Sequence, residues 1–243
     1  MCGRFTLTTP AAEWAALFEL DPIPVFEPRY NIAPTQPVAA VRSRFRAQHE
    51  EAGPEPEPTG GPAREFAKLR WGLVPRWAKE PDLKGRTLIN ARSETVAERP
   101  SFRDSYRFRR CLVVADGFYE WQPAGARKQP YWIRLDTEAP FAFAGLWDAW
   151  SDGTETLESC TILTTEANDA LRPIHDRMPV IIDPAHYDTW IHPETPSWDL
   201  ERLLGPWPSE AMLIHPVSTH VNHVGNDDPA CIAPQRTQTD LFR

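Results

Sequence analysis

The stretch CLVVADGFYEWQPAGARKQPYWIRLDTEAPFAFAGLWDAW, residues 111–150, decides the fold class of this chain. Its apolar and aromatic residues fall into short runs, and glycine, proline and charged residues separate one run from the next. Such runs, rich in β-branched and aromatic residues, are typical of strands. They lie at 111–115, 118–122, 130–135 and 141–147. The stretch therefore predicts consecutive strands joined by short connections, which favours antiparallel pairing.

The flanking sequence continues this pattern. Further strands are expected at 37–46, 159–164 and 212–217, and short helices at 11–20, 165–172, 184–191 and 199–204. The 26 prolines argue against long helices and for many turns. We therefore expect an α+β single domain over residues 1–243, with a mainly antiparallel, barrel-like curled β-sheet and short flanking helices.

One segment departs from the strand pattern. HEEAGPEPEPTGGPA, residues 49–63, is acidic, rich in proline and glycine, and almost free of apolar residues. This composition predicts a flexible loop. A strand-like run, EFAKLRWGLV at 65–74, follows at once. We therefore interpret residues 49–63 as a hairpin insertion within one domain.

Composition limits the class of protein. The formal net charge of −8 argues against coating nucleic acid by charge alone, but it allows a local basic cleft. The four cysteines show no C-x-x-C spacing, so a disulfide framework or a thiolate zinc site is not expected. A signal-peptide pattern and an 18-residue apolar run are both lacking. We expect a soluble protein of the reducing cytoplasm with no membrane partner.

The first residues, Met1-Cys2-Gly3-Arg4, carry the strongest chemical signal. Removal of Met1 would leave Cys2 with an α-amine and a thiol on adjacent carbons. The amine has a reference pKa of about 7.7–8.0, against about 10.4 for lysine, so far more of it is uncharged near neutral pH. An uncharged amine attacks aldehydes to form a Schiff base. The thiol can then close on the imine carbon to form a five-membered thiazolidine. A buried structural cysteine is the simpler alternative for position 2 alone.

Four segments place polar or reactive residues inside apolar or turn-rich runs: MCGRF at 1–5, LINARSET at 88–95, ADGFYEW at 115–121 and IHDRMP at 174–179. Together, in this order, they resemble the SOS-response-associated peptidase family, whose members are abasic-site processing proteins. RYNIAP at 29–34, WGLVPRW at 71–77 and HPVSTHVN at 215–222 also resemble the family pattern. The resemblance extends from residue 2 to about residue 230.

The resemblance implies four catalytic residues. Cys2 is similar to the residue that forms a covalent thiazolidine with an abasic site in single-stranded DNA. Asn90 resembles the side chain that positions the freed α-amine, and an amide oxygen can accept a hydrogen bond from that amine. Glu120 resembles the acid/base group that opens the deoxyribose ring. His175 resembles a second acid/base residue at the Schiff-base step, a role that its reference pKa of about 6.5 suits.

Each of these residues also has a plain structural explanation. Asn90 could satisfy a turn or a bulge. Glu120 could be the solvent-facing member of an alternating strand. His175 could be a surface histidine paired with its charged neighbours. Their joint occurrence with Cys2 favours the catalytic interpretation.

The resemblance also implies DNA contacts, with single-stranded DNA as the partner. Arg4 and Arg92 are similar to phosphate-binding arginines, and Thr164 is expected to be a further DNA-binding residue. Pro34 and Trp77 are candidate wedges or stacking platforms. The basic run FRDSYRFRR at 102–110 could extend a basic groove or form a solvated charged face.

No metal or other cofactor is expected. His215, His220 and His223 form an H-x4-H-x2-H pattern, but we recognised no carboxylate or thiolate at a suitable ligand interval beside them. A monomer is expected.

A second enzyme class begins in the same way. Class II glutamine amidotransferases also open with Met-Cys-Gly and use the exposed cysteine on an amide. This chain has no arginine-glycine-proline-aspartate segment of the kind that holds glutamine in those enzymes. The family also implies an autopeptidase activity that removes Met1, which a methionine aminopeptidase could equally perform. Hydrolase and lyase activities remain open.

Overall fold

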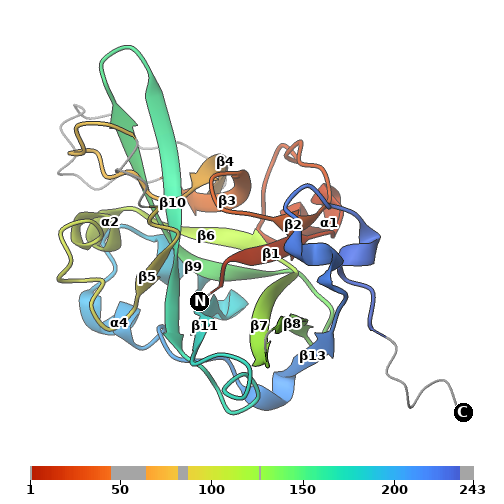
Figure 1. Cartoon of the computed structure of the whole chain (residues 1–243). Helices are drawn as coiled ribbons and strands as arrows, with labels where there is room; N and C mark the ends of the chain where they lie inside the picture. Colours follow the sequence, from red (N-terminus) through yellow and green to blue (C-terminus); the bar gives the residue numbers. More distant parts are fainter. Residues whose placement is uncertain (1, 45–63, 82–86, 126, 236–243) are drawn as a thin grey trace, which may run out of the picture.

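The computed structural model describes residues 2–44, 64–81, 87–125 and 127–235 and contains two β-sheets that meet at the N-terminus (Figure 1). The 49–63 loop expected from composition lies outside the described residues. Among the described helices, none is long and apolar enough to cross a membrane.

The larger sheet has eight strands, and five of them close into a barrel. Their order is β10-β4-β3-β6-β9, and pairing of β9 with β10 closes the ring. The β10–β4 pair is parallel, and the other four pairs of the ring are antiparallel. This confirms the expected α+β class with a mainly antiparallel, barrel-like sheet. The ring strands are β3 (Pro37–Ser43), β4 (Arg64–Trp71), β6 (Arg110–Ala115), β9 (Phe141–Ser151) and β10 (Thr156–Glu166).

Three short strands of the larger sheet lie outside the ring. They are β5 (Asn90–Arg92), β11 (Arg177–Pro179) and β12 (Ile181–Ile182). β5 runs parallel to β10, and β11 runs antiparallel to the end of β10. β10 therefore lies between the segments 88–95 and 174–179 and brings them together at its end, although about 80 residues separate them in the sequence.

The smaller sheet has five strands in the order β13-β8-β7-β1-β2. β1 pairs antiparallel with both β2 and β7, with Arg4 opposite Tyr119. The strands are β1 (Arg4–Leu7), β2 (Arg29–Ile32), β7 (Gly117–Ala124), β8 (Arg127–Leu135) and β13 (Met212–Pro216).

Aromatic packing fixes β1 against the barrel. The Phe5 ring is 5.1 Å from that of Trp71 on β4 and 5.7 Å from that of Phe143 on β9, both edge to face. All three side chains are buried. Full burial of one such side chain stabilises a fold by about 1.5–3 kcal/mol. This packing holds the backbone next to Cys2 at the junction of the two sheets.

The helices are short, as the proline content predicts. They are α1 (Ala11–Leu17), α2 (Arg103–Phe108), α3 (Tyr187–Ile191) and α4 (Ser197–Glu201), with 3-10 turns η1 (Pro184–His186), η2 (Ser209–Ala211), η3 (Thr219–Asn222) and η4 (Pro229–Cys231). The helix expected at 165–172 is wrong. β-branched Thr164 and Thr165 continue β10 and pair with β11, and Asn168 then accepts the backbone N–H of Leu171 in a turn.

Candidate functional site

The site is centred on Cys2, where the two sheets meet. Cys2 is fully buried, and its carbonyl accepts a hydrogen bond of 2.8 Å from Nδ2 of Asn90 on β5. Cys2 precedes β1 of the smaller sheet, so this bond joins the two sheets. Burial, followed by the charge of nearby Glu120, raises the pKa of the Cys2 thiol well above its ordinary value. The thiol therefore keeps its proton at neutral pH.

The other half of the Asn90 amide is unused. Its Oδ1 is buried and has no hydrogen-bond partner among the residues that the structure describes. A buried acceptor without a donor is costly, by about 1–3 kcal/mol, and such an atom in a native site needs a reason. Oδ1 belongs to the amide group that already contacts Cys2. It is therefore an acceptor held close to the backbone of that residue.

Glu120 lies on β7 and is buried, with 2% of its surface exposed. The solvent-facing alternative from strand alternation is therefore wrong. Tyr119 is buried as well, because β7 is covered on both faces at this point. Burial raises the pKa of the Glu120 carboxyl, while the charge of His175 acts in the opposite direction. Glu120 can therefore hold a proton at higher pH than an ordinary glutamate.

His175 lies in the turn before β11, with its ring partly exposed. Its Nδ1 is 2.9 Å from the backbone N–H of Arg177 and 2.9 Å from Oδ1 of Asp176. The backbone N–H can only donate and is fixed by the chain, whereas the Asp176 carboxylate is an exposed side chain. We therefore assign Nδ1 as an acceptor, which places the proton of the neutral ring on Nε2.

An ion pair locks the two segments that flank β10. Arg177 donates to both carboxylate oxygens of Glu94, at 2.5 and 2.9 Å, and to the carbonyl of Thr164 at 2.5 Å. Hydrogen bonding by Arg177 lowers the pKa of Glu94. A bidentate pair of this kind fixes geometry as well as charge. It holds the turn that carries His175 against the strand end that carries Asn90.

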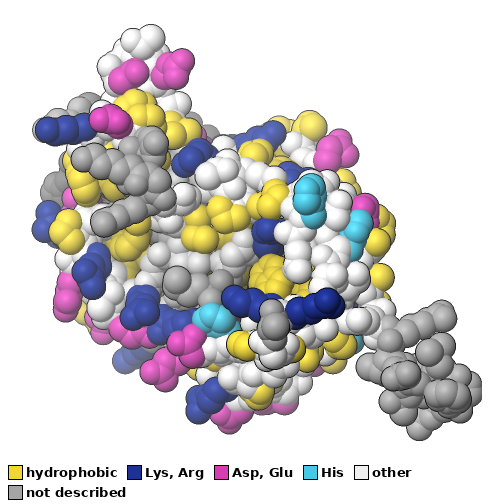
Figure 2. Space-filling view, viewed as in Figure 1, with side chains coloured by type: hydrophobic (Ala, Val, Ile, Leu, Met, Phe, Trp, Pro, Cys, Tyr) yellow, Lys and Arg dark blue, Asp and Glu magenta, His cyan; other side chains and the backbone are white. Residues whose placement is uncertain are grey.

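A pocket of about 610 Å³ opens beside these groups. Its lining residues are Arg4, Glu120, Trp121, Arg127, Lys128, His175, Thr219 and Asn222. Figure 2 shows basic side chains beside a histidine around the hollow on the face that carries the N-terminus. We call Cys2, Asn90, Glu120 and His175 the N-terminal site.

A larger pocket of about 890 Å³ is much less suited to nucleic acid. Its charged lining residues are Glu94, Glu98, Glu166, Asp169, Glu201 and a single arginine, Arg172. Phosphate groups would be repelled there, whereas the pocket at the N-terminal site has an excess of positive charge. Charge therefore favours the smaller pocket as a DNA site.

The candidate DNA-binding residues fall into different environments. Arg4 lines the pocket and donates to Asn31 Oδ1 at 2.8 Å and to the Val221 carbonyl at 3.0 Å. Its hydrogen-bonded partners are neutral oxygens, so they leave its charge intact. Arg92, at the end of β5, is exposed.

Two other candidates are at least partly accessible. Trp77 is 60% exposed, and the turn that carries it is anchored by the backbone N–H of Arg76 bonded to Asp148. Pro34 is half-buried. Thr164, by contrast, is fully buried, and its hydroxyl lies 3.4 Å from the Ala91 carbonyl. The Thr164 side chain supports the strand beneath Arg92 and does not reach solvent.

The basic run at 102–110 does not form a continuous basic groove. Arg109 and Arg110 are buried. Arg109 pairs with Asp148, and Arg110 donates to backbone carbonyls, including those of Tyr106 and Trp190. These two cations serve packing, which sequence charge alone could not reveal.

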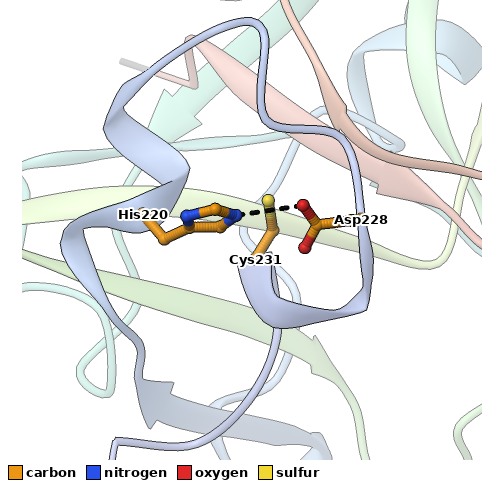
Figure 3. A group of neighbouring side chains, drawn as sticks. All are labelled: His220, Asp228 and Cys231. Carbon is orange, nitrogen blue, oxygen red and sulfur yellow. Dashed lines mark hydrogen bonds and ion pairs between the residues drawn. The ribbon is translucent and has the colours of Figure 1, made fainter.

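A second group of potential ligands lies in the C-terminal segment. Ligand atoms of His220, Asp228 and Cys231 all lie within 4.8 Å of one another, and we call this group the C-terminal cluster (Figure 3). The sequence pattern had not placed a carboxylate or a thiolate beside His220. The loop between η3 and η4 folds back on itself and brings them there.

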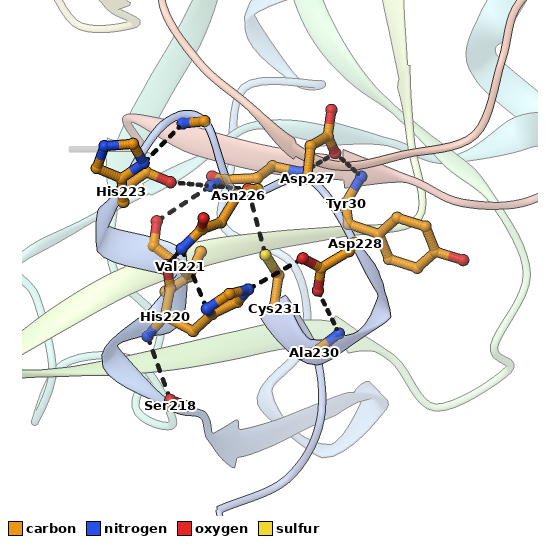
Figure 4. Close-up of polar contacts among 12 residues, drawn as sticks. Tyr30, Ser218, His220, Val221, His223, Asn226, Asp227, Asp228, Ala230 and Cys231 are labelled. Carbon is orange, nitrogen blue, oxygen red and sulfur yellow. Dashed lines mark hydrogen bonds and ion pairs between the residues drawn. The ribbon is translucent and has the colours of Figure 1, made fainter.

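The hydrogen bonds of the C-terminal cluster fit a loop clamp better than a metal site (Figure 4). Asn226 Nδ2 donates to the His220 carbonyl at 2.8 Å and lies 3.1 Å from Nδ1 of the same residue. Nδ1 is then an acceptor, so Nε2 keeps the proton that it shares with Asp228 at 3.0 Å. The Cys231 thiol donates to the Asn226 carbonyl, and burial raises its pKa. Metal binding needs a bare imidazole nitrogen and a thiolate, and this network occupies both.

Sequence reasoning missed the residue that connects this loop to the pocket. Asn31 is fully buried on β2, and its Nδ2 donates to the carbonyls of Val221, His223 and Asn226. Its Oδ1 accepts from Arg4. Asn31 lies within the RYNIAP segment, where an asparagine inside a short apolar strand was the available signal.

The fold and the site together define a class of protein. It is a single closed barrel with an attached sheet, in which the second residue of the chain lies among an amide, a buried carboxyl and an imidazole. The sequence model of the family described as SOS response associated peptidase (SRAP) matches residues 1–224. The chain belongs to this family.

Similar proteins carry related names. The abasic site processing protein YoaM of Bacillus subtilis is 39% identical, and the match covers 93% of this chain and 95% of YoaM. The abasic site processing protein HMCES of Xenopus tropicalis is 34% identical, with 86% of this chain matching 66% of it. Among solved structures, a protein from Bacteroides thetaiotaomicron has a TM-score of 0.79 at 24% identity, covering 97% of this chain and 100% of that one. This last likeness concerns the fold.

Proposed function

We propose that this protein processes abasic sites in single-stranded DNA by forming a covalent thiazolidine between Cys2 and the ring-opened sugar. The cross-link would shield the site during the DNA damage response. Family membership supports the substrate class. The single observation that carries the chemistry is the Asn90 amide, which binds the Cys2 carbonyl through Nδ2 and keeps a buried Oδ1 without a partner among the described residues.

The Asn90 geometry suits a free amine. Once Met1 is removed, the Cys2 nitrogen carries hydrogens to donate, and Oδ1 belongs to the amide that already bonds the Cys2 carbonyl. An amide oxygen orients the amine without offering the negative charge that would hold it in its protonated form. The uncharged amine then presents its lone pair to the pocket. Asn90 thus acts as a positioning group in the reaction.

Ring opening comes first, because an abasic sugar is mostly a closed hemiacetal. A proton leaves the C1 hydroxyl, a proton arrives at the ring oxygen, and the C1–O4 bond breaks to leave an aldehyde. Glu120 suits the donor role because burial raises its pKa, so it stays protonated at higher pH than an exposed glutamate. His175 lines the same pocket and carries protons in the later steps.

The amine reacts before the thiol. Its attack on C1 gives a carbinolamine, which loses water with a proton supplied by His175 or Glu120 and becomes a Schiff base. The Cys2 sulfur then bonds to C1, and the thiol proton passes to the imine nitrogen. One water leaves overall, and no oxidant is needed. The raised pKa of the thiol supports this order, since the imine nitrogen provides an acceptor for a proton that Cys2 otherwise retains.

Removal of Met1 is the first requirement of this mechanism. An autopeptidase reaction at the N-terminal site or a methionine aminopeptidase would serve equally. Lyase and hydrolase activities, a monomeric state, and association with the nucleoid in the cytoplasm belong to the same proposal.

A cross-linking assay tests the proposal. Processed protein is incubated with single-stranded DNA carrying one abasic site and resolved under denaturing conditions. We expect a stable shifted band for the wild type and none for Cys2→Ala. Cys2→Ser keeps the amine, so we expect it to give a stable adduct after borohydride reduction of the Schiff base. A stable band in Cys2→Ala would refute the role of the Cys2 thiol in the cross-link.

The alternative function is an outcome of the same experiment. If processed wild type gives no band with abasic DNA and releases ammonia from glutamine, the site is that of an N-terminal-cysteine amidohydrolase. Mass measurement of the intact protein verifies beforehand that Met1 is absent.

A further inference from the structure

One stretch of the pocket wall has no part in the proposed chemistry. It is the part of the β7–β8 hairpin beyond Glu120, which contributes Trp121, Arg127 and Lys128 to the lining. Arg127 and Lys128 lie at the tip, in register with Ala124 and Pro123. Both are exposed, and neither forms an ion pair with any residue that the structure describes.

The hairpin is anchored to the pocket at its base. The Trp121 indole N–H donates to Asn222 Oδ1 at 2.7 Å, and Gln122 Nε2 donates to the Pro173 carbonyl at 2.9 Å. The first bond ties β7 to η3, and the second ties it to the segment that leads to His175. The two cations therefore belong to a supported wall.

The hairpin and Arg92 belong to different sheets, on either side of Cys2. Arg92 lies on β5 of the barrel sheet, whereas the hairpin belongs to the smaller sheet, and Cys2 lies where the two sheets meet. Figure 1 shows the N-terminus between β5 and β7. A single strand whose sugar reaches Cys2 therefore meets Arg92 on the barrel side and the hairpin on the other.

We propose that Arg127 and Lys128 bind backbone phosphates on one side of the abasic nucleotide and so direct the strand across Cys2. This inference rests on the proposed function for the identity of the strand. The cations would act on binding and not on the chemical steps, because they lie at the hairpin tip, whereas Glu120 lies farther back on β7, opposite Tyr131. The overall charge of −8 gives such a local basic wall a large influence on where DNA binds.

Salt dependence tests the inference. The DNA carries a tetrahydrofuran analogue, which cannot open to an aldehyde, so that only reversible binding is measured. For Arg127→Ala/Lys128→Ala, we expect the slope of log K against log salt to fall by about 0.7 for each phosphate that is no longer neutralised. The matched control is Arg103→Ala/Arg107→Ala on α2, which removes the same charge from exposed positions outside the pocket lining. The control should keep the wild-type slope.

Truncated strands add direction to the test. Two oligonucleotides are compared, each lacking the nucleotides on one side of the analogue. The one that lacks the nucleotides contacted by the hairpin should bind wild type and the hairpin variant equally, and the other should bind the hairpin variant more weakly than wild type. At saturating natural abasic DNA, the hairpin variant should cross-link within about twofold of the wild-type rate, because only ground-state binding is removed. Equal slopes for the hairpin variant and wild type, or an equal decrease in the control, would overturn the inference.

The two proposals fail in different ways. If wild type cross-links abasic DNA and the hairpin variant keeps the wild-type slope, only the inference about the hairpin is wrong. If wild type binds the analogue with a slope that depends on Arg127 and Lys128 but never cross-links natural abasic DNA, the proposed chemistry is wrong and the binding wall remains.

Discussion

The N-terminal site and the C-terminal cluster contain the same three chemical types, a thiol, a carboxyl and an imidazole, in different surroundings. In the C-terminal cluster, hydrogen bonds within one loop engage both imidazole nitrogens and the thiol. In the N-terminal site, the groups come from separate strands and turns, and beside them an amide oxygen of Asn90 lacks a partner among the described residues. The same residue types therefore differ in the hydrogen-bonding capacity that they leave unused. On this basis we expect reactivity at the N-terminal site and not in the C-terminal cluster.

The largest expected difference is between the two cysteines. Cys2→Ala should abolish the stable covalent product, because it removes the thiol that closes the thiazolidine, and the remaining α-amine can form only a reversible Schiff base. Cys231→Ala should cross-link within about twofold of wild type and lose stability by about 0.5–3 kcal/mol, as buried substitutions commonly do. Denaturing gels measure the first effect and urea unfolding the second.

Loss of the covalent product in a folded Cys231→Ala variant would contradict this expectation. The C-terminal cluster would then take part in the chemistry, and its network could not be only a clamp.

The next largest expected difference is between the carboxyl groups of Glu120 and Asp228, in their effect on the rate of cross-linking. Glu120→Gln should slow cross-linking by about 10²–10⁴, the usual contribution of a general acid or base, with little change in binding of the tetrahydrofuran analogue. Asp228→Asn should leave the rate at saturating DNA within about twofold of wild type, since it weakens only an ion pair within the loop. Single-turnover kinetics separate the rate from the affinity.

An aldehyde that needs no ring opening serves as the control. If Glu120 acts at ring opening, its variant should react with a simple open-chain aldehyde at close to the wild-type rate. An equal defect with both substrates would move Glu120 to the Schiff-base step.

The same two carboxyls should titrate with opposite effects on stability. Burial raises the folded-state pKa of Glu120 above about 4.3. Its contribution to the free energy of unfolding is therefore present below that pH and is lost as pH rises through the folded pKa. The hydrogen bond from His220 lowers the pKa of Asp228 below about 3.9, so its contribution is present above that pH and is lost as pH falls through the folded pKa.

Unfolding free energies measured against pH test this contrast. The stability of wild type relative to Glu120→Gln should fall as pH rises from about 4, and that relative to Asp228→Asn should fall as pH drops below about 4. Difference curves of the same sign would contradict the environments described for the two groups.

The smallest expected effect concerns zinc. Added zinc should not raise the melting temperature, because the protonated Nε2 of His220 and the buried thiol of Cys231 are not ready ligands. Cys231→Ala serves as the matched control. A zinc-dependent rise in wild type that is absent in this variant would show that the C-terminal cluster is a metal site.

Much of the fold could be predicted from alternation and turns. The strand runs at 111–115, 118–122, 130–135 and 141–147 all fall within observed strands. The short strand β5 was missed, because a three-residue strand has too few residues for a periodic pattern. The helix expected at 165–172 failed because pairing with β11 extends β10 into that segment.

The candidate site was predicted as a set of residues and not as an arrangement. Glu120 could be named from GFYEW, but its burial depends on β7 being covered on both faces. Arg109 and Arg110 looked available for DNA, yet Arg109 pairs with Asp148 and Arg110 donates to the Trp190 carbonyl, about 40 and 80 residues farther along the chain. Pairings across such separations leave no local mark in the sequence.

The sequence by itself determined the class of fold and the presence of a cysteine at position 2 with its possible partners, because periodicity, turn residues and side-chain chemistry are local properties. Tertiary structure alone decided which groups meet. It joined Asn90 to Cys2 across two sheets and buried Glu120. It also folded His220, Asp228 and Cys231 into a satisfied network. The physical reason is that burial and hydrogen bonding set the protonation and the availability of each group, and both depend on neighbours far away in the chain.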